Sequence, residues 1–128
     1  MPLKSFHHVA LIVSDYNRAK EFYTEVLGFS ILDENYRSVR ESFKLDLIGP
    51  GDMRIELFSF PNSPKRPSRP ESCGLRHLAF RVTHLEVEIE RISKLGVNCE
   101  PIRVDEYTGK RFTFFADPDG LPLELYEE

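Results

Sequence analysis

The sequence predicts an α+β protein built from two copies of a βαβββ module. An internal repeat is the first sign, because the segment His7–Val13 returns 69 positions later as Arg76–Val82, with histidine, alanine and valine at matching places. Each copy is followed by one amphipathic helix pattern and then by several short strand patterns. A segment with four prolines separates the copies. We therefore expect a single domain, two modules and a proline-rich connector: 1–128 for the domain, 5–60 and 75–128 for the modules, and 61–74 for the connector.

Composition and charge limit the class of partner. The chain has 128 residues, of which 41% are hydrophobic, enough to bury a core without disulfide bonds. A formal charge of −4 and a pI near 5.6 do not favour nucleic acid. No run approaches the roughly 20 apolar residues of a membrane span, and the first residues lack a signal-peptide pattern. Cys73 and Cys99 are expected to be free thiols, which favours the reducing cytoplasm. Together these features lead us to expect a cytoplasmic protein that binds neither membrane nor nucleic acid.

The first module begins with a short β-branched segment, 6–13, that predicts a strand. Ser14 and Asp15 are the predicted candidates for the helix N-cap, and apolar residues at steps of three and four continue the helix to Leu27. Gly28 suits the left-handed residue that ends such a helix. Three further strands are predicted, the second broken near Glu41 and followed by a turn at 49–52: 29–34, 37–48 and 53–60.

The second module repeats this order after the connector. The prolines of the connector oppose both helix and central strand, and its Lys and Arg residues indicate a solvated linker in preference to a phosphate-binding patch. A strand at 75–82 leads to a helix that starts with the capping-box spacing of Thr83 and Glu86 and ends at Gly96. The remaining strands are predicted on either side of a turn at 117–120: 97–104, 111–116 and 121–126.

Strand alternation places a histidine or a glutamate on the same kind of face in four strands. One face of each strand is apolar and suits packing against a helix, whereas the other carries the polar residue. The four residues are His8 and Glu56 in the first module and His77 and Glu124 in the second. A single strand histidine is usually structural or exposed. The prediction therefore depends on the repetition, with separations of 48 and 47 positions within the modules.

These four side chains predict a site for one divalent metal ion. Imidazole nitrogen and carboxylate oxygen suit Zn²⁺, Ni²⁺, Co²⁺, Mn²⁺ or Fe²⁺, and two carboxylates balance the charge of the ion. His7 competes with His8 as a ligand, but strand alternation places His7 on the face toward the helix. His84 stands at a helix start and is expected to be a solvated residue.

Several motifs resemble the glyoxalase I branch of the vicinal oxygen chelate superfamily, which has the glyoxalase–bleomycin resistance fold. They are H-V-A-L-I-V from His8, I-E-L-F around Glu56, R-H-L-A-F around His77 and D-P-D-G-L-P-L-E-L around Glu124. The resemblance extends over Ser5–Glu128 and looks closest to the bacterial YaeR-type glyoxalase-like proteins. It implies that the four predicted residues hold the metal ion.

The resemblance also implies a reaction. Proteins of this branch are metal-dependent lyases or isomerases that act on a small α-oxo or α-hydroxy compound or its thiol adduct. Two neighbouring substrate oxygens bind the ion, which stabilises an enediolate while a carboxylate removes a carbon-bound proton. Glu124 is the first candidate for this base and Glu56 the second. A homodimer is expected, in which two modules form a cup around each site.

Three further positions bear on the substrate. Ile12 stands where bacterial glyoxalase I has an arginine for a glutathione carboxylate, and Phe60 stands where it has an asparagine. Both changes argue against glutathione as the thiol. Arg81 follows His77 at the distance at which Ile12 follows His8, and it suits either an anionic substrate group or an exposed strand end.

Two alternative functions remain open. Another enzyme of the superfamily, an epimerase or an Fe²⁺ dioxygenase, can use the same fold. A dioxygenase would use His8, His77 and Glu124, and Glu56 argues against it because a fourth protein ligand takes a position that oxygen or substrate needs. A protein that only binds a small molecule, as in the bleomycin-resistance branch, does not need the metal ligands.

Overall fold

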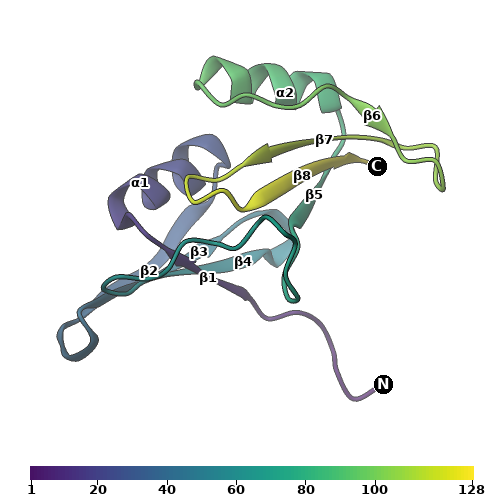
Figure 1. Ribbon diagram of the computed structural model, residues 1–128. Helices are drawn as coiled ribbons and strands as arrows, with labels where there is room; N and C mark the ends of the chain where they lie inside the picture. The colour runs from purple at the N-terminus through teal and green to yellow at the C-terminus, as the bar shows by residue number, and fades with distance from the viewer. The chain divides into compact units, whose positions relative to one another are not determined.

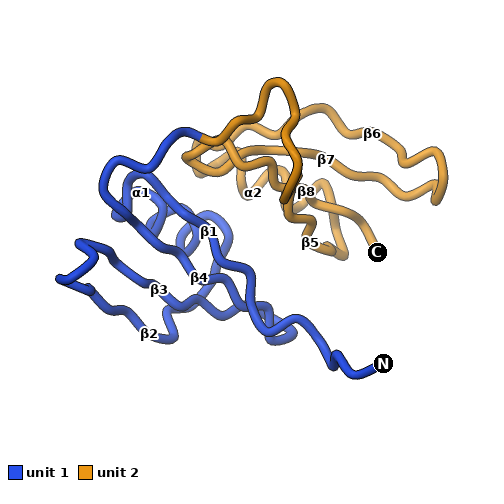
Figure 2. The backbone as a smooth tube through the Cα atoms, turned by 60° about the horizontal axis from the view of Figure 1, so that its bottom comes forward, with its two compact units in different colours: residues 1–65 blue, residues 66–128 orange.

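The computed structural model describes residues 1–128 as two compact units, unit 1 (Met1–Lys65) and unit 2 (Arg66–Glu128) (Figures 1 and 2). Each unit contains one four-stranded mixed sheet and one main helix in the order βαβββ, so the predicted α+β fold is confirmed. The chain passes from unit 1 to unit 2 inside the proline-rich segment 61–74, which contains no helix or strand. No helix has the length and apolar character needed to cross a membrane.

Unit 1 contains four strands, one α-helix and three short helical turns. The elements are β1 (Val9–Val13), α1 (Tyr16–Glu21), the π-helical turn η1 (Phe22–Val26), β2 (Ser30–Arg37), the 3-10 turn η2 (Ser38–Arg40), β3 (Ser42–Ile48), the 3-10 turn η3 (Pro50–Asp52) and β4 (Arg54–Ser59). The strand order is β1-β4-β3-β2. Strand β1 is parallel to β4, and the other neighbours are antiparallel.

Unit 2 repeats this topology. The elements are β5 (Leu78–Val82), α2 (Leu85–Lys94), β6 (Arg103–Val104), β7 (Arg111–Ala116) and β8 (Pro122–Glu127). The strand order is β5-β8-β7-β6, with β5 parallel to β8 and antiparallel pairs elsewhere. The parallel pair therefore has the same place in both units, and this pair carries the predicted metal ligands.

The core of unit 1 forms between the helical segment and one face of the sheet. Along β1, β3 and β4 the buried residues alternate with less buried ones, as the alternation of side chains predicts, whereas β2 contributes no buried residue. The helical segment contributes Ala19 and Tyr23, both 0% exposed. Each fully buried leucine or isoleucine contributes roughly 2 kcal/mol relative to an exposed one. The buried sheet residues of unit 1 are Leu11, Val13, Leu45, Leu47, Ile55 and Leu57.

The core of unit 2 follows the same rule but is smaller. Helix α2 covers one face of the sheet (Figure 1) and buries Leu85 and Ile92. Leu123 and Leu125 of β8 alternate with residues of the opposite face and are 0% and 4% exposed. Because the apolar residues point toward the helix, Glu124 between them points to the other face.

The ends of the first helix confirm two predictions and correct a third. The Asp15 side chain accepts a hydrogen bond from the Arg18 N–H, as an N-cap does. Gly28 has a φ of 81°, the left-handed conformation predicted for it. The continuous α-helix expected up to Leu27 is wrong, because the segment changes to a π-helical turn at Phe22. Within this turn the Leu27 N–H bonds to the Phe22 carbonyl, five residues earlier.

The start of the second helix corrects another prediction. The N-cap is His84, whose side chain makes no capping hydrogen bond, so the predicted capping box of Thr83 and Glu86 does not form. Glu86 instead pairs with Arg111 of β7, with 2.8 Å between the carboxylate oxygen and the guanidinium nitrogen. A long-range ion pair of Glu86 thus replaces the local hydrogen bonds of a capping box that the spacing suggested.

Several strands are shorter than the sequence suggests, among them β5, which begins at Leu78 and not at Leu75. Strand β1 begins at Val9, not at Phe6, and β6 contains only Arg103 and Val104 of the expected 97–104. Pro101 interrupts the second segment, because proline lacks the N–H that a sheet ladder needs. The expected break near Glu41 is present, since Glu41 has a φ of 48° between η2 and β3.

Candidate metal centre

Each unit brings one histidine beside one glutamate across its parallel strand pair. In unit 1, Ala10 of β1 lies opposite Glu56 of β4, and His8 stands two residues before Ala10. Residues two apart on an extended chain point to the same side. His8 and Glu56 therefore meet on the face that does not pack against the helix. Unit 2 repeats the arrangement with His77, just before β5, and Glu124 of β8.

Within each pair, the histidine and the glutamate are close enough to bind the same ion. His77 Nε2 lies 3.1 Å from Glu124 Oε1, and His8 Nδ1 lies 3.6 Å from Glu56 Oε2. In the unit 2 pair the side chain of His77 is 26% exposed and that of Glu124 is 11% exposed. In the unit 1 pair the side chain of His8 is 38% exposed and that of Glu56 is 16% exposed. Each pair thus has a nearly buried carboxylate beneath a more accessible imidazole.

The chemistry and spacing of these donors fit a divalent ion. Nitrogen and oxygen ligands bind such ions at about 2.0–2.2 Å, so two neighbouring ligands of one ion stand about 3.0–3.5 Å apart. The His77–Glu124 distance of 3.1 Å lies in this range, and the His8–Glu56 distance of 3.6 Å is slightly longer. Neither unit by itself contains a group of three or more His, Cys, Asp or Glu side chains arranged to hold a metal ion. Each unit therefore supplies two of the four predicted donors.

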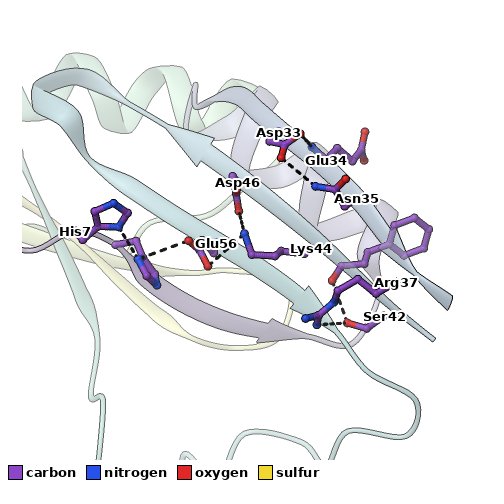
Figure 3. Close-up of polar contacts among 11 residues, drawn as sticks. His7, Asp33, Glu34, Asn35, Arg37, Ser42, Lys44, Asp46 and Glu56 are labelled. Atoms are coloured by element: carbon purple, nitrogen blue, oxygen red, sulfur yellow. Dashed lines mark hydrogen bonds and ion pairs between the residues drawn. The ribbon is translucent and has the colours of Figure 1, made fainter. Parts of the chain in front are cut away.

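A lysine and an aspartate of β3 flank the pair in unit 1 (Figure 3). Lys44 Nζ lies 3.7 Å from Glu56 Oε1 and 2.6 Å from Asp46 Oδ1. The hydrogen bond to Asp46 raises the pKa of Lys44 above its ordinary value, and the charge of Glu56 adds to this effect. The lysine is therefore a positive charge beside one of the two predicted carboxylate ligands.

His7 is also close to this pair, which differs from the sequence prediction. Its side chain is exposed, and its Nδ1 lies 2.9 Å from His8 Nδ1 (Figure 3). Like His8, His7 precedes β1, and its side chain is exposed to solvent and does not pack against the helix. The expectation that His7 packs toward the helix is therefore wrong.

Aromatic residues and arginines surround the pair in unit 2. The Phe114 ring packs edge-on against the His77 ring with 5.1 Å between centroids. Both rings, together with Glu124 and Arg103, line a hollow of about 380 Å³. Arg103 lies over the Phe112 and Phe114 rings, 5.1 and 5.6 Å from their centroids. This hollow is a place for a small molecule beside the donor pair.

The two half-sites differ at one equivalent position. In unit 1 the residue of β3 opposite Glu56 is Asp46, whereas in unit 2 the residue of β7 opposite Glu124 is Phe114. The two units thus have the same predicted metal ligands, one histidine and one glutamate each, but different residues next to them. At this position unit 1 has a charged residue and unit 2 has an aromatic one.

The three predicted substrate residues lie on or beside the same strands. Ile12 of β1 is 60% exposed and is two residues beyond Ala10, so it shares the ligand face. Arg81 of β5 pairs with β8 through its backbone, and its exposed side chain makes no hydrogen bond or ion pair. Phe60 follows β4, is half-buried and stacks on Phe58 with 6.1 Å between ring centroids. All three remain candidates for contact with a substrate.

Sequence reasoning missed Lys44, Arg76 and Arg103. Lys44 occupies β3 beside Glu56, and the two arginines line the hollow of unit 2. Their signal is weak, because a charged residue in a strand is usually solvent-exposed. Only the pairing of neighbouring strands shows that these charges stand next to the donors.

Comparisons with known proteins agree with the fold. Residues 5–125 match the family described as the Glyoxalase/Bleomycin resistance protein/Dioxygenase superfamily. The chain is 57% identical to the uncharacterized protein YaeR of Escherichia coli (strain K12), covering 98% of both chains. It is 56% identical to the uncharacterized protein YwkD of Bacillus subtilis (strain 168), covering all of both. A solved structure, the glyoxalase family protein from Enterococcus faecalis, superposes with a TM-score of 0.93 at 51% identity, covering 99% of this chain and 100% of that one.

More distant relatives include enzymes with different reactions. A 2-epi-5-epi-valiolone epimerase of an Actinomyces species is 31% identical over 93% of this chain and 76% of that protein. A probable lactoylglutathione lyase of Vibrio cholerae (serotype O1, strain El Tor Inaba N16961) is 30% identical over 94% of this chain and 88% of that protein. Similarity at this level is shared by a lyase and an epimerase, so it does not select one reaction.

Proposed function

The chain belongs to the Glyoxalase/Bleomycin resistance protein/Dioxygenase superfamily, and on this basis we propose that it is a metal-dependent lyase or isomerase of the glyoxalase I type. The observation that carries the proposal is the pair of His–Glu contacts at equivalent places of the two units, 3.1 and 3.6 Å long. A protein that only binds a small molecule has no need to keep both. The proposed substrate is a small α-oxo or α-hydroxy compound or its thiol adduct.

In this proposal His8, Glu56, His77 and Glu124 together hold one divalent ion, which is Zn²⁺, Ni²⁺, Co²⁺, Mn²⁺ or Fe²⁺. When bound, such an ion supplies positive charge that stabilises negative charge developing on neighbouring substrate oxygens. Two glutamates and two neutral imidazoles balance that charge, so a partly buried site is tolerated. The two half-sites come together either within one chain or between two chains of a homodimer.

Glu124 is the preferred base of the proposed reaction. A carboxylate that takes a proton from carbon needs an oxygen that is free of other cationic partners. Glu56 faces Lys44 at 3.7 Å, whereas Glu124 forms an ion pair with His77 and with no lysine or arginine. Glu124 is also the more buried of the two carboxylates, with a side chain that is 11% exposed against 16% for Glu56. Glu56 remains the second candidate.

The substrate-facing residues favour a co-substrate other than glutathione. Ile12 offers an exposed apolar surface and Phe60 an aromatic one, and neither side chain can bind a carboxylate or an amide. Arg81 has no partner in the structure and remains available for one anionic group. We therefore propose a smaller thiol, or a substrate that needs no thiol.

The reaction is tested on protein loaded separately with each of the five ions. Lactoyl-thioester formation from methylglyoxal is measured with glutathione and with smaller thiols, and isomerisation of α-hydroxy ketones is followed by proton exchange. We expect turnover with at least one substrate, and its loss in Glu124→Gln at saturating metal. Glu90→Gln, an exposed glutamate of α2, is the matched control. Full metal occupancy without turnover of any of these substrates contradicts the proposal.

Two other measurements separate the alternatives. Oxygen uptake with a catechol by the Fe²⁺-loaded protein identifies a dioxygenase. Native protein that is purified without metal, and whose His8→Ala variant binds a small molecule as well as the wild type does, identifies a binding protein.

Mixing two variants tests whether the two half-sites of one metal site belong to the same chain or to two different chains. His8→Ala disables unit 1 of its chain, and His77→Ala disables unit 2. If a site combines units from different chains, subunit exchange in the mixture restores one complete site in each mixed dimer. If a site forms within one chain, the mixture binds no more metal than the separate variants. Light scattering measures the expected dimer mass in parallel.

A further inference from the structure

Unit 2 contains a second hollow beside the one that holds the His77–Glu124 pair. Its volume is about 390 Å³, and arginines dominate its charged lining. We call this hollow the arginine pocket. Its charged residues are Arg66, Arg69, Arg76, Arg103, Glu71 and Glu100.

The positive charges in the arginine pocket outnumber the negative ones. Two ion pairs are present, Arg76 with Glu71 at 3.0 Å and Arg103 with Glu100 at 3.3 Å. The side chains of both pairs are more than half exposed, so water screens them and they open at little cost. Four guanidinium groups face two carboxylates, which leaves two positive charges without a negative partner.

The remaining two arginines have no acidic partner. Arg66 donates from Nη2 to the backbone carbonyls of Leu75 and Arg76, each at 2.9 Å, and these carbonyls are neutral. Its Nε is buried and has no hydrogen-bond partner, which is rare for a guanidinium nitrogen. Arg69 makes no hydrogen bond or ion pair. The backbone bonds hold Arg66 in place, so its charge is available in a fixed position.

The arginine pocket adjoins the donor pair. Arg76, Arg103 and Phe114 line both hollows. Arg76 Nη1 lies 3.4 Å from His77 Nδ1, and His77 Nε2 faces Glu124. A molecule whose reacting oxygens lie at the donor pair therefore has arginines within reach of a second group a few atoms away.

We propose that the arginine pocket binds an oxyanion group, carboxylate or phosphate, carried by the substrate of the neighbouring metal centre. This inference rests on the proposed function and narrows its substrate to a small organic acid or phosphate ester. Guanidinium groups suit both oxyanions because they donate two parallel hydrogen bonds. The aromatic rings beneath Arg103 keep its plane in a defined orientation. The basic residues of the connector, expected from the sequence to be solvated, thus contribute to a binding site.

The test measures anion binding on the metal-free full chain, so that it does not depend on catalysis. Inorganic phosphate and malonate are titrated by calorimetry at about 0.15 M ionic strength, where non-specific attraction is screened. We expect the double variant Arg69→Gln/Arg103→Gln to bind the preferred anion at least about tenfold more weakly. The matched control Arg40→Gln/Arg91→Gln removes the same charge from exposed positions outside the pocket and is expected to bind like wild type.

Each result decides the inference. Tighter phosphate binding assigns the pocket to phosphate esters, and tighter malonate binding assigns it to carboxylic acids. Equal loss in the control variant, or equal affinity in the pocket variant, overturns the inference. If the double variant is poorly folded, Arg103→Lys is measured in its place. This variant keeps the positive charge but loses the paired hydrogen bonds, so we expect its affinity for the anion to lie between that of the wild type and that of a variant without the charge. Because His8→Ala impairs the metal centre and leaves unit 2 intact, it retains anion binding, so failure of the proposed reaction is distinguishable from failure of the pocket.

Discussion

His77 Nε2 lies 3.1 Å from Glu124 Oε1, the spacing of two neighbouring ligands on one divalent ion. The first prediction therefore concerns the chain's four histidines. His77→Ala and His8→Ala each remove a proposed ligand, and we expect metal affinity to fall at least about a hundredfold in both. Competition with a chromophoric chelator measures the affinity for Zn²⁺ and Ni²⁺.

Two histidines outside the proposed ligand set are the controls for this experiment. His84 precedes α2 and is exposed, so His84→Ala is expected to bind metal like wild type. His7 lies beside His8 but outside β1, and we expect His7→Ala to change affinity by less than about threefold. A large loss in His7→Ala with normal binding in His8→Ala would exchange the roles of the two residues.

The second prediction concerns Lys44, which lies 3.7 Å from Glu56. A positive charge near the donors repels a bound cation, so Lys44→Gln is expected to tighten metal binding by about fivefold, or about 1 kcal/mol. Lys44→Arg keeps the charge and is the control. Since the effect is electrostatic, we expect it to shrink when the ionic strength rises. Weaker binding in Lys44→Gln would show instead that the lysine holds Glu56 in its ligand position.

The sequence was sufficient for features that depend on local periodicity. Alternation along β4 and β8 separates buried Leu57 and Leu123 from the glutamates, and repetition of that pattern identified both donor pairs. Asp15 and Gly28 were predictable because a helix end has its own local chemistry.

Features that depend on long-range pairing were not predictable. Lys44 is 12 positions before Glu56, and only the antiparallel register of β3 and β4 brings them together. Glu86 had the spacing of a capping box but pairs with Arg111, which is 25 positions away. Arg66 belongs to a proline-rich segment whose composition indicates a linker, and its role depends on how that segment folds back on Leu75 and Arg76. The local sequence of a segment does not show which distant residues it will contact, and each of these three contacts joins residues that are far apart in the chain or depends on how a loop folds back.

A third prediction tests the core of unit 1 with two leucines from neighbouring strands. Leu47 of β3 is 1% exposed, whereas Leu32 of β2 is 49% exposed. Leu47→Ala leaves a cavity, and we expect the free energy of unfolding to fall by about 3 kcal/mol. Leu32→Ala is expected to change it by less than about 0.5 kcal/mol. Urea denaturation followed by circular dichroism measures both, and equal losses contradict the assignment of faces.

The last prediction concerns the pH dependence of stability through Tyr16. Burial, and then the hydrogen bond that its hydroxyl donates to the Glu34 carboxylate, raise the pKa of Tyr16 above the ordinary value of 10.0. Since the pKa is raised on folding, this group stabilises the protein fully below pH 10 and loses its contribution as the pH rises through the raised value. Tyr16→Phe removes the group, so below pH 9 we expect it to be about 1–2 kcal/mol less stable than the wild type.

The measurement is the difference in the free energy of unfolding between wild type and Tyr16→Phe, taken from urea denaturation at several values between pH 8 and pH 11. Effects of other titrating groups cancel in this difference, which is expected to be constant up to about pH 9 and to narrow above pH 10. Tyr107 is 90% exposed, so Tyr107→Phe is the control and is expected to differ from wild type by less than about 0.5 kcal/mol at every pH. A difference between wild type and Tyr16→Phe that stays constant up to pH 11 would show that Tyr16 ionises equally easily in the folded and unfolded chain. The hydrogen bond to Glu34 would then contribute nothing to the stability of unit 1.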